Sequence, residues 1–278
     1  MPLLQSFVQL GRRVVPRGWA PLLRLAARAN PRLRAYSARL ASGDRLVLDL
    51  SQTMCLGYLF DGGQPHNQGL DRVMARVLQP GGVFVDVGAN LGHYTRLGST
   101  AVGPGGQVHA FEPLPSALPL LAANTQGRAN VTVHPVAVGA GAGEIDFYAR
   151  PMGDTSSMEP AAGAERISVR LTTLDETLSE LPRLDLLKID VEGFELEVLQ
   201  GARALIRAHQ PVIYFEFLVA QNQSRGLTLD DYRALLAPLG YAFYWSNHSG
   251  TGPVAVSGPQ SSDVVALPAR WMERVQPA

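Results

Sequence analysis

The residues best suited to do chemistry form two short clusters that lie far apart in the chain. The first covers residues 83–93 (VFVDVGANLGH), where an acid and two glycines close a short apolar run. The second covers residues 188–193 (KIDVEG), where a lysine and two acids follow another apolar run. Carboxylates can hold a cation, accept hydrogen bonds from hydroxyl groups or remove a proton from one. Glycines let a backbone turn sharply and approach a ligand closely.

The first cluster predicts a buried strand, a glycine loop and the start of a helix. Its spacing, Asp86-x-Gly88-x-x-x-Gly92, differs from the dinucleotide fingerprint Gly-x-Gly-x-x-Gly, because Asn90 stands in place of a middle glycine. An acid at a strand end suits a cationic ligand better than a pyrophosphate, which it would repel. The acid two residues before the first glycine resembles motif I of the methyltransferases that use S-adenosylmethionine (SAM), a cofactor with ammonium and sulfonium groups. We therefore predict cofactor contacts from the loop: Asp86, Gly88, Ala89, Asn90 and Gly92. A βα turn of some other α/β protein is the alternative.

A further acid follows the next predicted strand. Glu112 lies 20 residues after Gly92 and is followed by Pro113. An acid in this register can accept hydrogen bonds from both ribose hydroxyls of a nucleoside, although it could also face a helix dipole. We predict that Glu112 and Pro113 bind the cofactor. The contact with the adenine ring is left open among four residues: Asn124, Asn130, His134 and Glu144.

The second cluster predicts the opposite wall of the same crevice. Lys188 and Asp190 are two residues apart, so they share one face of a strand. A buried lysine is costly unless it is paired, and we expect an ion pair with Asp190 or Glu216. Lys188 can therefore be a purely structural residue. Asp190 and Glu192 lie where the strand opens into the crevice, and for these two acids we favour an active-site role.

The elements that must position these clusters alternate between strand and helix, which predicts an α/β protein with helices on both faces of a mostly parallel sheet. We expect strands at 83–87, 107–111, 131–138, 185–190, 211–217, 241–245 and 262–267, and helices at 70–78, 114–126, 194–208 and 227–239. Residues 144–149 and 166–171 predict a second hairpin or an insertion. Residues 45–50 and 54–60 predict a hairpin before the main sheet.

Four segments, 83–95, 109–113, 173–175 and above all 187–195, resemble the FkbM-type SAM-dependent methyltransferases, in the expected order. The resemblance covers residues 45–267. It implies a Rossmann-like class I methyltransferase fold, with a seven-stranded sheet whose last strand is antiparallel. It also implies SAM as cofactor and transfer of a methyl group to a hydroxyl of a small substrate, such as a sugar, a glycan or a secondary metabolite. The alternatives are an NAD-linked oxidoreductase and a SAM-binding partner protein without catalysis.

Methyl transfer to an alcohol requires in-line positioning and benefits from a base. We predict Asp190, Glu192 and His93 as catalytic residues, with Glu216 as a further candidate for the base. His93 follows the glycine loop at the start of a helix, where a lone histidine is more often structural. Two acids are too few ligands for a metal ion, and none is predicted.

Composition separates the N-terminal segment from the rest of the chain. The 278 residues have no net charge, so nothing in the overall charge points to nucleic acid. Residues 1–43 nevertheless contain eight arginines and no acid. We expect a basic, mainly helical appendage at 1–43 and a methyltransferase domain at 44–278. The appendage is either a solvated helix pair or a contact to a membrane surface or partner protein. The single cysteine, Cys55, fits a reducing compartment, and we expect a cytoplasmic location.

Overall fold

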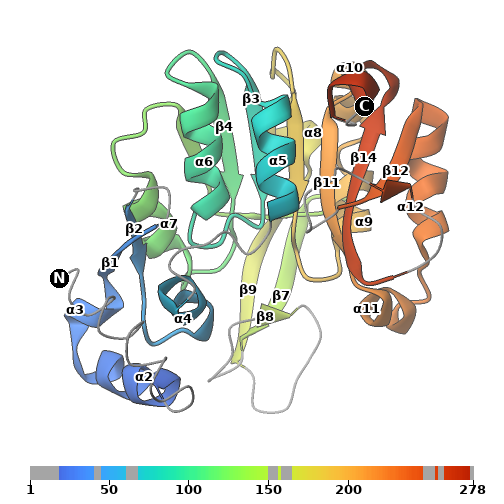
Figure 1. The fold of residues 1–278 in the computed structure, drawn as a ribbon. Helices are drawn as coiled ribbons and strands as arrows, with labels where there is room; N and C mark the ends of the chain where they lie inside the picture. Colours follow the sequence, from blue (N-terminus) through green and yellow to red (C-terminus); the bar gives the residue numbers. More distant parts are fainter. Residues whose placement is uncertain are drawn as a thin grey trace.

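The fold is seen in a computed structural model, which describes residues 19–40, 45–60, 68–149, 156–157, 165–246, 254–255 and 260–275. Its centre is a sheet of strand order β13-β12-β14-β11-β10-β3-β4-β5 (Figure 1). The strands are β3 (Val83–Val87), β4 (Gln107–Phe111), β5 (Val131–His134), β10 (Leu186–Ile189), β11 (Val212–Phe217), β12 (Tyr241–Trp245), β13 (Val254–Ala255) and β14 (Ser262–Pro268).

The direction of the strands confirms the predicted sheet. Strands β5, β4, β3, β10 and β11 are parallel neighbours, and β14 runs antiparallel to both β11 and β12. The edge strand β13 adds only two residues to this seven-stranded arrangement. The chain winds outward from β3 to β5 and then returns to add β10 on the other side of β3. The carboxyl ends of β3 and β10 therefore flank a topological switch point, where ligands bind in open α/β sheets.

Helices cover both faces of the sheet, as the alternating pattern predicted. One face packs on α5 (Gln68–Val77), α6 (His93–Val102) and α13 (Met272–Val275), with Phe84 among the buried strand residues. The other face packs on α8 (Leu174–Thr177), α9 (Glu195–Gln200), α10 (Arg203–His209) and α12 (Leu229–Leu236), with Val85 among its strand residues. Neighbouring residues of one strand thus enter opposite cores. The remaining elements here are α7 (Leu118–Thr125), α11 (Val219–Ser224), η1 (Ala237–Leu239) and η2 (Ala269–Trp271).

A second, smaller sheet has the order β6-β9-β7-β8. Its strands are β6 (Ala137–Val138), β7 (Gly143–Ala149), β8 (Ser156–Ser157) and β9 (Glu165–Thr172). The antiparallel pairing of β7 with β9 confirms the predicted second hairpin. The strand predicted over 131–138 is divided, because Pro135 has no N–H group to continue a ladder, and β6 joins the smaller sheet. The predicted loop over 151–163 lies outside the described residues, apart from β8.

The N-terminal region contains α2 (Trp19–Ala29), α3 (Pro31–Arg34), β1 (Tyr36–Arg39), β2 (Arg45–Leu48) and α4 (Thr53–Phe60). Of the predicted mainly helical appendage at 1–43, the described residues form the helices α2 and α3 and the strand β1. The predicted hairpin is wrong in its second strand: β2 pairs with β1, and residues 53–60 are helical. Cys55, Leu56 and Leu59 are buried with helical spacing, and a short apolar run does not distinguish a strand from a buried helix by periodicity alone.

The predicted boundary between the appendage and the methyltransferase domain lies at residue 44. Strand β1 lies before this boundary and is hydrogen-bonded to β2, which lies after it. Within the described residues, no helix combines the length and apolar character needed to cross a bilayer.

Candidate active site

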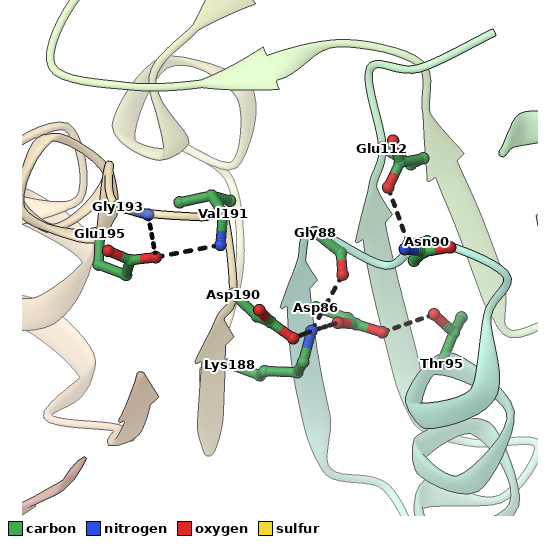
Figure 2. A network of polar contacts seen from close by, with 10 residues as sticks. All are labelled: Asp86, Gly88, Asn90, Thr95, Glu112, Lys188, Asp190, Val191, Gly193 and Glu195. Atoms are coloured by element: carbon green, nitrogen blue, oxygen red, sulfur yellow. Dashed lines mark hydrogen bonds and ion pairs between the residues drawn. The ribbon is translucent and has the colours of Figure 1, made fainter. Parts of the chain in front are cut away.

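The two chemically promising clusters meet because β3 and β10 are adjacent and parallel, with Lys188 paired to Asp86 in the register (Figure 2). Just beyond the strands, the Asp190 N–H donates to the Val87 carbonyl at 3.1 Å. Gly88 passes so close that a Cβ atom there would lie 1.9 Å from the Asp190 carbonyl oxygen, and its φ is +77°. Only glycine fits this crossing. The contact places the glycine loop directly against Asp190, one of the candidate catalytic residues.

Lys188 connects the two clusters electrostatically. Its Nζ lies 3.0 Å from Asp86 Oδ1 and 3.5 Å from Asp190 Oδ2, and it donates to the Gly88 carbonyl at 3.0 Å. Burial disfavours the charge of Lys188, but the two carboxylates outweigh it and raise its pKa above the ordinary value. The expected pair with Asp190 is thus present, and Lys188 is a charged structural residue that fixes both walls.

Asp86 is fully buried, and its charge is compensated within the protein. Besides the contact with Lys188, its Oδ2 accepts a hydrogen bond from the Thr95 hydroxyl at 2.7 Å. Its negative charge is therefore matched by a cation of the protein itself. This geometry gives Asp86 a positioning role between β3, β10 and α6, and its direct contact with the cofactor stays a prediction.

The glycine loop is closed onto β4. The N–H groups of Gly88 and Ala89 both donate to the Phe111 carbonyl at 3.0 Å, and the Gly92 N–H donates back to Ala89 at 2.8 Å. Gly92 has a φ of +87°, which favours glycine, and a Cβ atom there would lie 2.7 Å from the end of the Leu121 side chain. These three N–H groups are therefore used within the protein. A ligand can still approach the loop backbone closely at the glycines.

Glu112 stands at the carboxyl end of β4, beside this loop. Its Oε2 accepts from the Asn90 N–H at 2.8 Å, and its Oε1 accepts from the Leu114 N–H at 2.9 Å. Burial raises its pKa, while these backbone bonds act in the opposite direction. A carboxylate has about four acceptor positions, so both oxygens keep capacity for ribose hydroxyls. Glu112 and the half-buried Pro113 thus fit the predicted nucleoside contact, which stays a prediction.

The four candidates for the adenine contact have different surroundings. Asn124 is committed to the backbones of β2 and the glycine loop, and Asn130 to the end of α6. Glu144 is exposed on β7. His134 stacks on Phe111 with ring centroids 4.3 Å apart, and its carbonyl accepts from the Glu112 N–H at 3.1 Å. Only His134 among the four therefore lies next to the predicted ribose contact.

The other side of the crevice gathers carboxylates from β10 and β11. The Asp190 side chain is 46% exposed although it contacts Lys188. Burial, followed by the charge of Asp190, raises the pKa of Glu192. Burial and the charges of Asp190 and Glu192 raise the pKa of Glu216 to about 8. No set of three or more candidate ligands for a metal ion occurs among the described residues.

The turn that carries Glu192 is held by a residue whose role the sequence did not reveal. Glu195 is buried, and its Oε1 accepts from the N–H groups of Val191 and Gly193 at 3.2 and 3.0 Å (Figure 2). Burial raises its pKa to about 7. Glu192 itself has a φ of +57°, which is unusual for a residue with a side chain. An acid that bonds back to the turn before its helix resembles a capping box, and that pattern is the available sequence signal.

Aromatic side chains from two helices cover the same region. His93 is buried, and its ring centroid lies 5.2 Å from Tyr58 of α4 and 4.9 Å from Tyr94 of α6. Lys188 Nζ lies 5.8 Å from the centroid of the Tyr94 ring. Burial raises the pKa of both tyrosines, and the charge of Asp190 adds to this effect. His93 is therefore packed among aromatic rings near Asp190, and its role as a base stays a prediction.

Comparisons with known proteins agree with this geometry. The family model "Methyltransferase FkbM domain" matches residues 86–243, which include the first cluster from Asp86 onward and the whole of the second. The hexuronic acid methyltransferase AglP of Haloferax volcanii is 32% identical over 144 residues, or 48% of this chain and 55% of that protein. Methyltransferase sdnD of Sordaria araneosa is 29% identical over 154 residues, or 42% of this chain and 59% of that protein.

A solved structure of methyltransferase FkbM from Methylobacillus flagellatus KT has 20% identity and a TM-score of 0.44, over 69% of this chain and 44% of that one. The chain spans little more than half the length of the two curated relatives. The family model, however, covers more than half of the 278 residues. The chain therefore belongs to the FkbM family of SAM-dependent methyltransferases.

Proposed function

We propose that the protein transfers the methyl group of SAM to a hydroxyl of a small substrate, either a sugar or glycan or a natural product. The observation that carries this proposal is the half-exposed Asp190, which Lys188 holds against the glycine loop. A carboxylate fixed at this crossing can face both a bound cofactor and an acceptor. The relatives support the substrate class, because one is named for a hexuronic acid.

The residues present fit the cofactor. Glu112 keeps acceptor capacity for ribose hydroxyls, and the loop at 88–92 allows backbone to approach a nucleoside closely. Asp86 and Lys188 neutralise each other below the loop and fix its base. When bound, SAM supplies an electrophilic methyl group on a positively charged sulfur. The protein has to bring an oxygen into line with that group, and positioning alone can supply much of the rate.

Asp190 is the best-placed acceptor for the proton that the hydroxyl loses. Lys188 orients its carboxylate through the 3.5 Å contact. Glu192 and Glu216 lie near enough for the charge of Asp190 to raise the pKa of each. Glu192 and His93 remain alternative bases in this proposal.

Two measurements test the proposal. Calorimetric titration with SAM should give binding, and labelled SAM should transfer its methyl group to members of a panel of uronic acids, neutral sugars and hydroxylated natural products. A methyl ether survives mild alkali whereas a methyl ester does not, so alkaline treatment of the product identifies the oxygen that is methylated. An alkali-labile or N-methylated product would contradict transfer to a hydroxyl. SAM binding without transfer across the panel would favour the non-catalytic partner protein.

A further inference from the structure

Helix α2 presents apolar side chains to solvent. Leu22 and Leu25 are 64% and 67% exposed, and they are the exposed large hydrophobic residues of the described chain. Arg28 is also exposed and continues the same spacing of three residues. Residues three apart lie side by side on a helix. We refer to Leu22, Leu25 and Arg28 as the outer face of α2.

The opposite side of α2 is anchored. Leu23 and Ala27 are buried in a core cluster that also contains Leu56 and Leu59 of α4. The helix is therefore held in one orientation by its buried face. Leu22 and Leu25 lie on the face that points away from this core. Figure 1 shows α2 beside α4 at one end of the molecule, away from α10 and α12.

The charged residues of the N-terminal sequence are of one sign. The segment of residues 1–43 has eight arginines and no Asp or Glu, whereas the chain as a whole is neutral. Two exposed arginines, Arg32 and Arg34, follow on α3. Helices that lie on an anionic bilayer have this composition. Their apolar residues enter the acyl chains, and their arginines contact the phosphates.

We propose that the outer face of α2 docks on the surface of an anionic lipid bilayer. A second copy of this chain is a poor occupant, because a symmetric contact would bring two acid-free basic segments together. A protein interface typically buries roughly 800 Å² on each partner, more than a stripe of two leucines and one arginine offers. This inference does not depend on the identity of the methyl acceptor.

Flotation of the full-length protein with vesicles tests the proposal. We expect binding to vesicles of phosphatidylcholine and phosphatidylglycerol, little binding to phosphatidylcholine alone, and weaker binding at high salt. Leu22→Ser with Leu25→Ser should reduce the affinity for anionic vesicles about tenfold, since two apolar side chains no longer enter the bilayer. Arg28→Gln with Arg32→Gln should also reduce it and flatten its dependence on salt.

A matched control removes the same charge elsewhere. Arg203 and Arg207 are exposed on α10, and Arg203→Gln with Arg207→Gln should leave vesicle binding unchanged. Unaltered SAM affinity in each variant shows that the fold is retained. The proposal is overturned if the native chain does not float with anionic vesicles, or if the leucine variant floats as well as the native chain. A dimer in sedimentation analysis that the leucine variant dissociates, without vesicle binding, would assign the face to a second copy instead.

Discussion

The two walls of the crevice satisfy their carboxylates in opposite ways. On the proposed cofactor side, Glu112 accepts hydrogen bonds from two backbone N–H groups, and Asp86 is paired with Lys188 and Thr95. On the proposed acceptor side, Asp190 is half exposed, and burial, followed by the charges of neighbouring acids, raises the pKa of Glu192 and of Glu216. The carboxylates of the first wall therefore have their partners within the folded protein. The second holds unfavourable interactions that a substrate can relieve, and such perturbed groups concentrate at functional sites.

Lys188 belongs to both walls, which makes the contrast testable. Its contact with Asp86 is shorter than its contact with Asp190, and Asp86 is fully buried. Changes on the cofactor side should therefore act mainly on stability and SAM affinity. Changes on the acceptor side should act mainly on turnover or on the pH dependence of stability.

The largest effect should come from Asp190→Asn. Loss of a general base typically lowers the rate by about 10² to 10⁴-fold, and we expect kcat to fall within this range. The affinity for SAM should change only a few-fold, because Lys188 keeps its contact with Asp86. Calorimetry with SAM and turnover with an identified acceptor measure the two quantities. Full turnover in this variant would show that Asp190 is not the base. The base would then be Glu192 or His93, and the proposed difference between the two walls would be wrong.

Asp86→Ala should act on the fold instead. It leaves the buried Lys188 with the longer contact to Asp190 as its ion pair, besides its hydrogen bond to the Gly88 carbonyl, and removal of one partner of a buried ion pair costs about 3–5 kcal/mol. Urea denaturation followed by circular dichroism measures the loss of unfolding free energy. The double change Asp86→Leu with Lys188→Met removes both charges and should recover part of that loss. A single variant as stable as the native chain would show that the pair is not a structural element.

Gly88→Ala tests the crossing between the walls. A Cβ atom would lie 1.9 Å from the Asp190 carbonyl, whereas a Cβ atom on Gly103 meets nothing within 4 Å. Both glycines have positive φ, so a side chain strains the backbone in both variants. We expect Gly88→Ala to lose at least about 2 kcal/mol more unfolding free energy than Gly103→Ala, and to bind SAM more weakly. Equal losses would mean that the close approach is unimportant.

Features that depend on local spacing could be predicted from the sequence. The glycine loop, the acid after β4 and the cluster at 188–193 each lie within a few residues of a strand end, and the sheet then brings them together. Long-range pairing was harder to predict. Lys188 was expected to pair with Asp190 or Glu216, but its shorter contact is with Asp86, because the register of β10 on β3 places these two residues side by side.

The aromatic cover of the site could not be predicted for a different reason. Tyr58 lies in a short apolar run whose strand or helix state depends on what it packs against, not on its own pattern. Residues 53–60 become a helix over a core that also contains Leu91 of the glycine loop. The wrong strand prediction therefore concealed a residue near Asp190. Similarly, nothing in the spacing of Asn124 indicated that its amide is used to bind β2.

The smallest effect should come from Glu216→Gln, and it sharpens the description of the acceptor wall. The pKa of Glu216 is raised from the ordinary 4.5 to about 8, mainly by burial and then by Asp190 and Glu192. The stability that the protonated carboxyl contributes is full below pH 4.5 and is lost as the pH rises toward 8. Glutamine does not ionise, so the variant should gain unfolding free energy over the native chain between these limits. Since Glu216 is partly exposed, we expect a gain of only about 1 kcal/mol.

Asp231→Asn is the control with the opposite sign. Bonds from the backbone N–H and hydroxyl of Thr228 lower the pKa of Asp231, so its carboxylate stabilises the fold above the ordinary pKa and this contribution is lost as the pH falls. Relative to the native chain, the asparagine variant should therefore lose stability only as the pH rises through the range below 3.8, and the difference should stay constant between pH 5 and pH 8, where Glu216→Gln should gain stability. Urea denaturation series at pH 5 and pH 8 compare the two slopes. If Glu216→Gln showed no pH-dependent gain, the carboxylates of the acceptor wall would not be crowded in solution, and the contrast between the two walls would rest on the exposure of Asp190 alone.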